Sequence, residues 1–169
     1  MRMTTLLLRH VIGTACWLLL TGAGSADRAW DFNLPALDGS HFVRASSVQG
    51  PLLVNFWGSE CPPCVEELPR LQAFAADHPA WTVWLVATDP APMARAFVER
   101  RAVHLPVLRA GQNVSGLMRA AGNCDGGLPF TVALRQGRIC AVREGALAPA
   151  DLASIDAACT TAAAQEPRR

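Results

Sequence analysis

The residues with the clearest chemical potential are Cys61 and Cys64, two residues apart in the stretch WGSECPPC (57–64). The apolar run LLVNF (52–56) before them predicts a buried strand, and the residues after Cys61 predict a helix. A thiol at the start of a helix lies near unpaired backbone N–H groups, which stabilise its thiolate. A thiolate attacks disulfides, and a second cysteine one turn along can resolve the mixed disulfide. The placement therefore predicts thiol–disulfide exchange, although a bare Cys-x-x-Cys pair also occurs in zinc sites.

Length and composition predict one domain with a substantial core, since the chain has 169 residues of which 51% are apolar. The formal net charge is +1, and the largest basic cluster is the pair Arg100-Arg101. Nucleic-acid binding therefore has no electrostatic support.

The first 26 residues are typical of an export signal, with a basic start (Arg2 and Arg9), an apolar segment (11–20) and small residues at 22–26. The apolar segment is shorter than the roughly 20 residues that span a bilayer, which favours a cleaved signal over an uncleaved anchor. We therefore expect a periplasmic protein in an oxidising compartment. The expected organisation is a signal peptide (1–26), one domain (27–160) and a disordered tail (161–169).

Alternating strand and helix patterns follow along the chain. We expect a hairpin around Asp38-Gly39, and a helix at 92–101 with Met93, Ala96 and Phe97 facing inward. The other expected elements are a strand from Pro51, a helix at 62–77, a strand at 81–87, an extended piece at 105–108, a helix at 114–121, strands at 130–134 and 139–143, and a helix from about 149. This order predicts an α/β fold with a mixed central sheet covered on both faces by helices.

Three separated blocks resemble one family. The block VNFWGSECPPCVEELPRL (54–71) resembles the exported thioredoxin-like proteins of the TlpA/ResA type, including the cytochrome c biogenesis reductants called DsbE or CcmG. The block GLPFTVALRQGRICAVREGAL (127–147) resembles the final hairpin of thioredoxin, and FNLPALDG (32–39) resembles the N-terminal hairpin of the TlpA group. The resemblance implies a thioredoxin-like fold with an N-terminal β-hairpin extension, in which Cys61 is the nucleophile and Cys64 the resolving cysteine.

The resemblance also implies a partner-binding wall opposite the two cysteines. It makes Pro129 a cis-proline, Leu128 a source of backbone contacts to a partner, and Trp57 a shield that meets partners. An X–Pro bond is the place where a cis peptide costs least, and Gly126-Gly127 lets the chain turn into it. Trp57 could instead be an ordinary core residue.

Four further positions are expected to tune the pair. Asn55 stands where cytoplasmic thioredoxin has a buried aspartate, and the TlpA group also carries Asn there. Glu60 should disfavour the thiolate, which leads to the hypothesis that it makes the pair a reductant rather than an oxidant. Pro62 and Pro63 form a stiff spacer, or are simply tolerated at a helix start. Glu67 matches the family pattern C-x-x-C-x-x-E-x-P and would relay protons, or is an ordinary surface residue.

Three cysteines remain in the mature chain. The last helix should run back along the preceding strand, which brings Cys159 near Cys140 and predicts a structural disulfide. Two buried free thiols are the alternative. Cys124 lies on the rim of the redox pair as a free thiol available for exchange, or pairs with Cys140 instead.

Together these features predict an exported thiol:disulfide oxidoreductase that reduces specific partner proteins without a cofactor or metal. By resemblance, its clients are cysteines of apocytochrome c or of copper-oxidase assembly proteins, and a membrane electron donor reduces it again. The alternative is a copper or zinc carrier that uses Cys61 and Cys64 as soft ligands. A peroxidase is disfavoured, since no threonine-then-cysteine site of the usual form is present.

Overall fold

The computed structural model describes residues 28–164, so the expected signal peptide (1–26) lies outside the described residues. Its central sheet has the strand order β5-β4-β3-β6-β7, and a separate two-stranded sheet pairs β1 with β2. The elements are β1 (Asn33–Pro35), β2 (Phe42–Arg44), η1 (Ala45–Ser47), β3 (Pro51–Trp57), α1 (Pro62–Asp77), β4 (Thr82–Ala87), α2 (Ala91–Arg100), β5 (Val107–Arg109), α3 (Val114–Ala121), β6 (Phe130–Arg135), β7 (Arg138–Glu144) and α4 (Pro149–Ala164).

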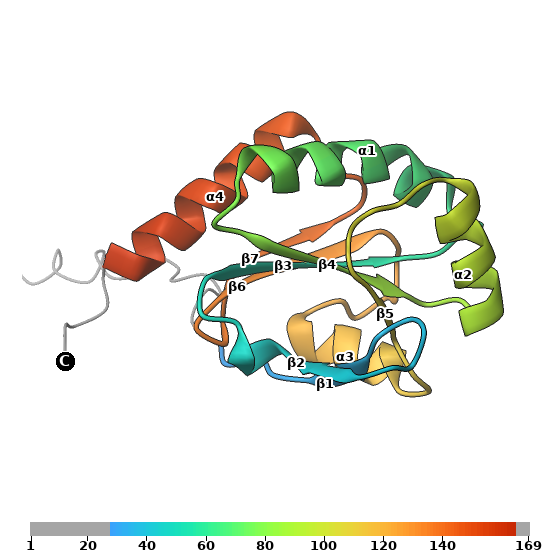
Figure 1. The fold of residues 1–169 in the computed structure, drawn as a ribbon. Coiled ribbons are helices and arrows are strands. Elements are labelled where there is room, and N and C mark those ends of the chain that lie inside the picture. Colours follow the sequence, from blue (N-terminus) through green and yellow to red (C-terminus); the bar gives the residue numbers. More distant parts are fainter. Residues whose placement is uncertain (1–27, 165–169) are drawn as a thin grey trace, which may run out of the picture.

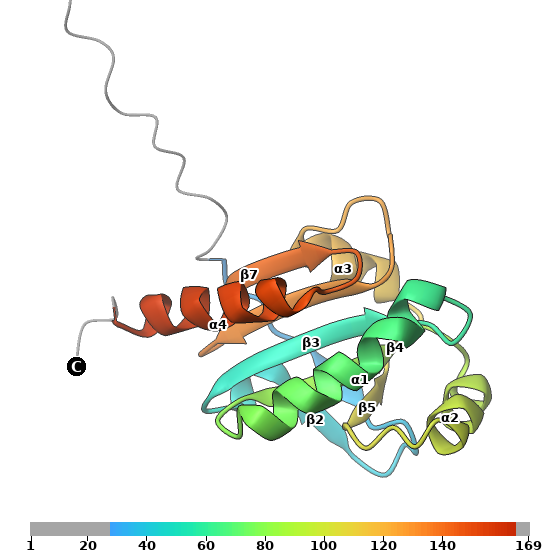
Figure 2. The same ribbon diagram turned by 90° about the horizontal axis from the view of Figure 1, so that it is seen from above.

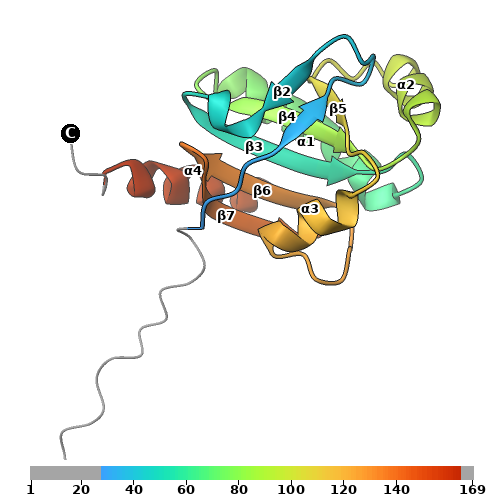
Figure 3. The ribbon, with the colours of Figure 1, turned by 90° about the horizontal axis from the view of Figure 1, so that it is seen from below.

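The sheet is mixed, as the element order predicts. Strand β3 runs parallel to β4 and antiparallel to β6, while β4–β5 is parallel and β6–β7 antiparallel. Helices α1 and α4 lie over one face, and α3 and the β1–β2 hairpin lie over the other (Figure 1). The views from above and below show these two covers separately (Figures 2 and 3). The expected mixed sheet with an N-terminal hairpin is therefore confirmed.

Strand β3 is the centre of the fold, because all seven of its residues are buried. A strand that is covered on both faces has a mostly apolar sequence, and the run before Cys61 shows this pattern. Leu53 and Trp57 face the core under α1, α2 and α4, whereas Val54 and Phe56 face the core under the hairpin and α3. The end of β3 is thus fixed from both sides where it delivers Cys61.

Helix α2 differs from the expectation in its rotation. Ala94 and Phe97 are buried, while Ala96 is exposed and Met93 is 42% exposed, so the expected inward positions of Met93 and Ala96 were wrong. Residues 93, 96 and 97 share one face of the helix, and residues 94, 97 and 98 share another. Both faces contain Phe97, so helical periodicity alone does not predict which of them is buried. In the structure the face with Ala94 is buried, and Phe97 packs on Trp57 with ring centroids 5.1 Å apart.

Helix α4 continues to Ala164, so the expected domain end at residue 160 falls inside it. Within residues 28–164, no helix is both long and apolar enough to cross a membrane.

Candidate active site

Cys61 and Cys64 form a disulfide where β3 ends and α1 begins, with a sulfur–sulfur distance of 2.05 Å and Cα atoms 5.3 Å apart. Cys64 is fully buried in the core cluster under α1, whereas Cys61 is partly exposed. Of the two cysteines, Cys61 is therefore the one that a second molecule can reach.

The first turn of α1 offers the Cys61 sulfur few donors. Cys61 is the N-cap residue, and Pro62 and Pro63 occupy the next two positions without N–H groups. The N–H of Cys64 donates to Cys61 Sγ (3.3 Å), and the N–H of Val65 donates to the Cys61 carbonyl (3.1 Å). Direct hydrogen bonding from this turn to the Cys61 sulfur thus rests on the N–H of Cys64 alone.

Replacing Pro63 by alanine is therefore expected to affect the Cys61 thiolate more than replacing Pro62. Pro63→Ala adds an N–H at the second helical position, from which backbone donors reach an N-cap side chain, so the thiolate of Cys61 should gain a hydrogen bond. Alkylation of Cys61 at pH 7 should rise up to ~10-fold, and the reduction potential should rise by about 30 mV, because a stabilised reduced form makes a stronger oxidant. Pro62→Ala is the matched control, since an N–H at the first position does not point at the cap. Equal shifts in the two variants would contradict this account.

The peptide bond between Leu128 and Pro129 is cis, and Pro129 is buried. Phe56 is paired with Phe130 across β3 and β6, so the next residue on each strand places Pro129 beside Trp57. Leu128 is half-buried, and a Cβ at Gly58 would lie 3.8 Å from Leu128 Cδ1. The Leu128-Pro129 segment therefore lies against the loop that leads into the cysteine pair.

The loop before Pro129 is closed by Asn123, a residue the sequence did not single out. Asn123 is buried, its Nδ2 donates to the Gly127 carbonyl (2.8 Å), and its Oδ1 accepts from the Gly126 N–H (2.7 Å). These hydrogen bonds stabilise the turn that contains Cys124, whose thiol is free and exposed.

Glu67 is fully buried, so its interpretation as an ordinary surface glutamate was wrong. Its Oε1 accepts from Asn55 Nδ2 (2.7 Å), and its Oε2 accepts from the N–H of Leu147 (2.7 Å). Asn55 Nδ2 also donates to Thr131 Oγ1 (3.0 Å), and Arg70 donates to the Leu147 carbonyl. Glu67 thereby connects α1 to β3 and to the loop that begins α4.

Burial raises the pKa of the Glu67 carboxyl, and the bonds from Leu147 and Asn55 and the charge of Arg70 lower it in part. A folded-state pKa above the unfolded one means that the folded protein binds more protons, so stability falls as pH rises from the unfolded pKa through the folded one. Glu67→Gln should remove this fall. Urea unfolding of the oxidised protein from pH 4 to pH 8 should give a flatter stability profile for Glu67→Gln than for the parent. Parallel profiles would contradict the assignment.

The side chain of Trp57 is fully buried and packs on Phe97 in the same core cluster as Cys64, which agrees with the alternative that Trp57 is a core residue. The residues next to Cys61 in the chain, namely Glu60, Pro62 and Pro63, are exposed.

Cys140 and Cys159 are bonded to each other, with Cα atoms 5.1 Å apart, and both are buried. The pairing of Cys124 with Cys140, left open by the sequence, does not occur. The second disulfide joins β7 to the last turns of α4.

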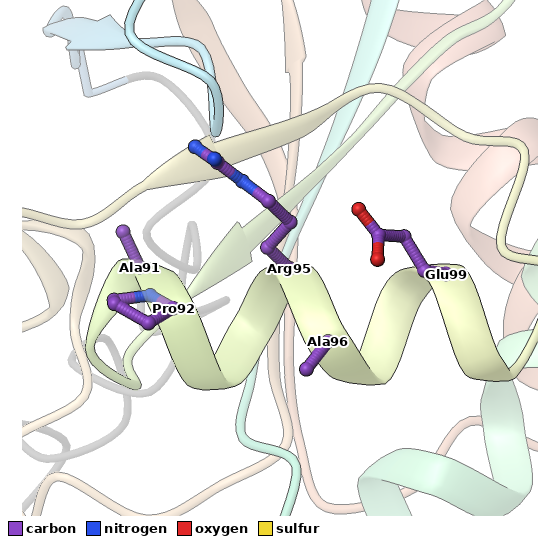
Figure 4. Close-up of a pocket in the computed structure, with 5 residues that line it drawn as sticks. All are labelled: Ala91, Pro92, Arg95, Ala96 and Glu99. Atoms are coloured by element: carbon purple, nitrogen blue, oxygen red, sulfur yellow. The ribbon is translucent and has the colours of Figure 1, made fainter.

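Two hollows lie away from the cysteine pair. One, of about 340 Å³, runs along α2 and is lined by Ala91, Pro92, Arg95, Ala96 and Glu99 (Figure 4). The other, of about 400 Å³, lies at the opposite end of the sheet and includes Trp81 and Asp156. Neither of these two hollows is lined by Cys61 or Cys64. Across residues 28–164, no group of three or more His, Cys, Asp or Glu side chains is arranged to hold a metal ion.

The sheet order, the Cys-x-x-Cys pair between β3 and α1, and the cis-proline before β6 define a thioredoxin-like protein. Residues 26–124 match the model of the AhpC/TSA family, and the chain belongs to that family.

Two kinds of relative agree with this assignment. The chain is 29% identical over 97 residues to the thiol-disulfide oxidoreductase ResA of Halalkalibacterium halodurans, a match that covers 54% of each protein, so the chain spans about half the length of this curated relative. A secreted Mycobacterium tuberculosis disulfide oxidoreductase homologous to E. coli DsbE superposes with a TM-score of 0.62 at 25% identity, covering 75% of this chain and 95% of that one. StoA from Bacillus subtilis superposes with a TM-score of 0.63 at 20% identity, covering 77% and 98%, and supports the fold.

Proposed function

We propose that the protein is a thiol:disulfide oxidoreductase whose reactive group is the Cys61–Cys64 pair. The observation that carries the proposal is the unequal exposure of the two bonded cysteines at the start of α1. An accessible cysteine that can form a mixed disulfide, backed by a buried cysteine that can resolve it, is the arrangement that two-step exchange requires. The ResA relative and the DsbE homologue are both known as disulfide oxidoreductases, which supports the same activity.

The reaction proceeds in two displacements. The Cys61 thiolate attacks one sulfur of a partner disulfide, a Cys61–partner disulfide forms, and the second partner sulfur leaves as a thiolate that takes a proton. The Cys64 thiolate then attacks Cys61 Sγ, which closes the Cys61–Cys64 disulfide and releases the partner as a dithiol. Two electrons pass from the protein to the partner, and the exchange needs no metal or organic cofactor.

Glu67 is the group proposed to accept the proton of Cys64. It lies three residues beyond Cys64 on α1 and therefore one turn further along the same face. A buried carboxyl with a raised pKa is a better proton acceptor than an ordinary surface carboxylate. Asn55 and the Leu147 N–H orient both of its oxygens.

The finer proposal is that the protein is exported to the periplasm and serves as a dedicated reductant. Its proposed clients are disulfides of cytochrome c or copper-oxidase assembly, and a membrane electron donor restores its dithiol. Glu60, which is exposed beside Cys61, is proposed to favour the reductant role by disfavouring the thiolate. The family resemblance of residues 54–71 supports these steps.

Partner trapping tests this proposal. In a Cys64→Ser, Cys124→Ser background the second displacement cannot occur, so mixed disulfides on Cys61 should accumulate and can be identified by mass spectrometry. Removing Cys124 matters because its exposed free thiol would capture partners by itself. Recovery of one or two assembly proteins is expected. A broad set of secreted proteins would point instead to a general oxidant or isomerase, and the same background with Cys61→Ser supplies the blank.

A further inference from the structure

The chain just after β4 is hydrogen-bonded to the chain just before Cys61. The N–H and the hydroxyl of Thr88 both donate to the Trp57 carbonyl (2.9 and 3.1 Å). Asp89 Oδ2 accepts a hydrogen bond of 2.6 Å from the N–H of Ser59. The paired register of β3 and β4 ends at Trp57 and Ala87. Residues 88 and 89 therefore extend the attachment past the end of both strands and into the redox loop.

Ser59 lies inside the turn that presents Cys61. The N–H of Cys61 donates to the Gly58 carbonyl (3.2 Å), which closes the turn over residues 58–61. Asp89 binds the middle of this turn through Ser59, so it fixes the turn to the sheet at a point two residues before the reactive cysteine. Pro90 follows Asp89 directly and is the N-cap residue of α2, and a proline restricts the backbone of the residue before it, here Asp89.

The hydrogen bond to the Cys61 sulfur depends on the position of the 58–61 turn relative to α1. Pro62 and Pro63 remove two backbone donors, so among residues 28–164 the Cys61 sulfur receives its hydrogen bond from the Cys64 N–H alone. A shift of the turn relative to α1 would lengthen that bond, and no neighbouring N–H of the first two helical positions is present to replace it. Less thiolate would then be available at neutral pH.

We propose that Asp89 is a positioning residue for the redox pair: by accepting from the Ser59 N–H, it holds the 58–61 turn so that Cys61 stays aligned with the Cys64 N–H. This role rests on the proposed exchange function of Cys61. The acceptor oxygen carries the effect, whereas the negative charge of Asp89 opposes it, because a nearby carboxylate disfavours a thiolate. The two contributions have opposite signs and can be separated by substitution.

The test measures the pH dependence of iodoacetamide alkylation of Cys61, followed by mass spectrometry in a Cys64→Ser, Cys124→Ser background that leaves Cys61 as the reactive thiol. Asp89→Ala removes acceptor and charge together, and Cys61 alkylation at pH 7 should fall about 10-fold, with its pH profile displaced upward by about one unit. Asp89→Asn keeps an acceptor oxygen and removes the charge, so its rate should be at least that of the background protein.

The matched control is Asp156→Ala. Asp156 is also a half-buried aspartate that accepts one hydrogen bond, from Trp81 Nε1 at 2.8 Å, but Trp81 precedes β4 at the opposite end of the sheet. Its alkylation profile should match the background, even if its unfolding temperature falls. This comparison separates loss of position from a general loss of stability.

Rescue by Asp89→Asn supports the proposal. Unchanged alkylation in Asp89→Ala, an equal loss in Asp89→Ala and Asp89→Asn, or faster alkylation in both would overturn it. If Asp89→Ala does not unfold cooperatively, Asp89→Glu carries the test: it keeps the charge but displaces the acceptor, so a severalfold slower rate is expected and an unchanged rate would overturn the proposal. Alkylation of Cys61 needs no client protein. If the parent protein reduced no disulfide, the exchange function would be overturned, but the alkylation result for Asp89 would still stand by itself.

Discussion

Replacing Cys61 by serine is expected to slow reduction of a model disulfide, such as that of insulin, by at least ~10³-fold, because a serine hydroxyl is a far weaker nucleophile at neutral pH than a thiolate. The measurement is a single-turnover assay with pre-reduced protein and quenched samples. Cys64 cannot take over the first displacement, since it is fully buried whereas Cys61 is partly exposed.

Two further variants make this result specific. Cys64→Ser should still react once with the model disulfide but should remain covalently attached to it, because the second displacement is lost. Cys124→Ser should keep the parent rate, since the Cys124 thiol is exposed but unbonded to either cysteine of the pair. A parent-like rate of reduction by Cys61→Ser, or loss of reduction in Cys124→Ser, would show that the wrong thiol has been assigned as the nucleophile.

The redox loop was predictable because its local signals agree. A mostly apolar run predicts a strand buried on both faces, and two prolines predict a helix start. All seven residues of β3 are buried and α1 begins at Pro62, as these signals indicate. The cysteines lie between them, so local sequence was sufficient to place both sulfurs.

The sequence also contains a signal for the burial of Glu67, although we interpreted Glu67 as a residue that tunes the redox pair or as an ordinary surface residue. Cys64, Glu67, Leu68 and Leu71 follow the i, i+3, i+4, i+7 spacing of one helical face, and all four are buried. A carboxylate on an apolar stripe requires a partner. The partner itself, the Leu147 N–H, lies 80 residues away in the chain, and only the folded arrangement brings it to Glu67.

The contacts of Asp89 had no comparable signal. Asp89-Pro90 reads as the end of a strand, and the structure confirms that end after Ala87. The acceptor function depends on a pairing between residues 59 and 89, whose relative position is set by the β3–β4 register. Side-chain bonds that cross between neighbouring loops are therefore the part of the site that local patterns do not encode.

Removing the second disulfide is expected to have the largest effect on stability. Cys140 and Cys159 are separated by 19 residues, and a cross-link that closes a loop of this size stabilises a protein by about 3 kcal/mol, chiefly by restricting the unfolded chain. The Cys140→Ala, Cys159→Ala double variant should lose about this free energy of unfolding in urea, with the Cys61–Cys64 disulfide kept oxidised in both proteins. Alanine is the suitable replacement because both positions are buried and a polar group there would add a separate cost.

The same double variant should retain its exchange chemistry, because the Cys140–Cys159 disulfide holds the C-terminal part of α4, whereas Glu67 binds the loop before the first residue of α4. Cys159 lies in the last part of α4, whereas Leu147, which donates to Glu67, comes just before its first residue, Pro149. Loss of the cross-link should first free the C-terminal turns, while the bonds from Asn55 and Leu147 to Glu67 persist in the folded protein. The expected outcome is a parent-like rate of model-disulfide reduction with a lower unfolding midpoint. A loss of rate that accompanies the loss of stability would show that the far end of α4 is coupled to the Glu67 network.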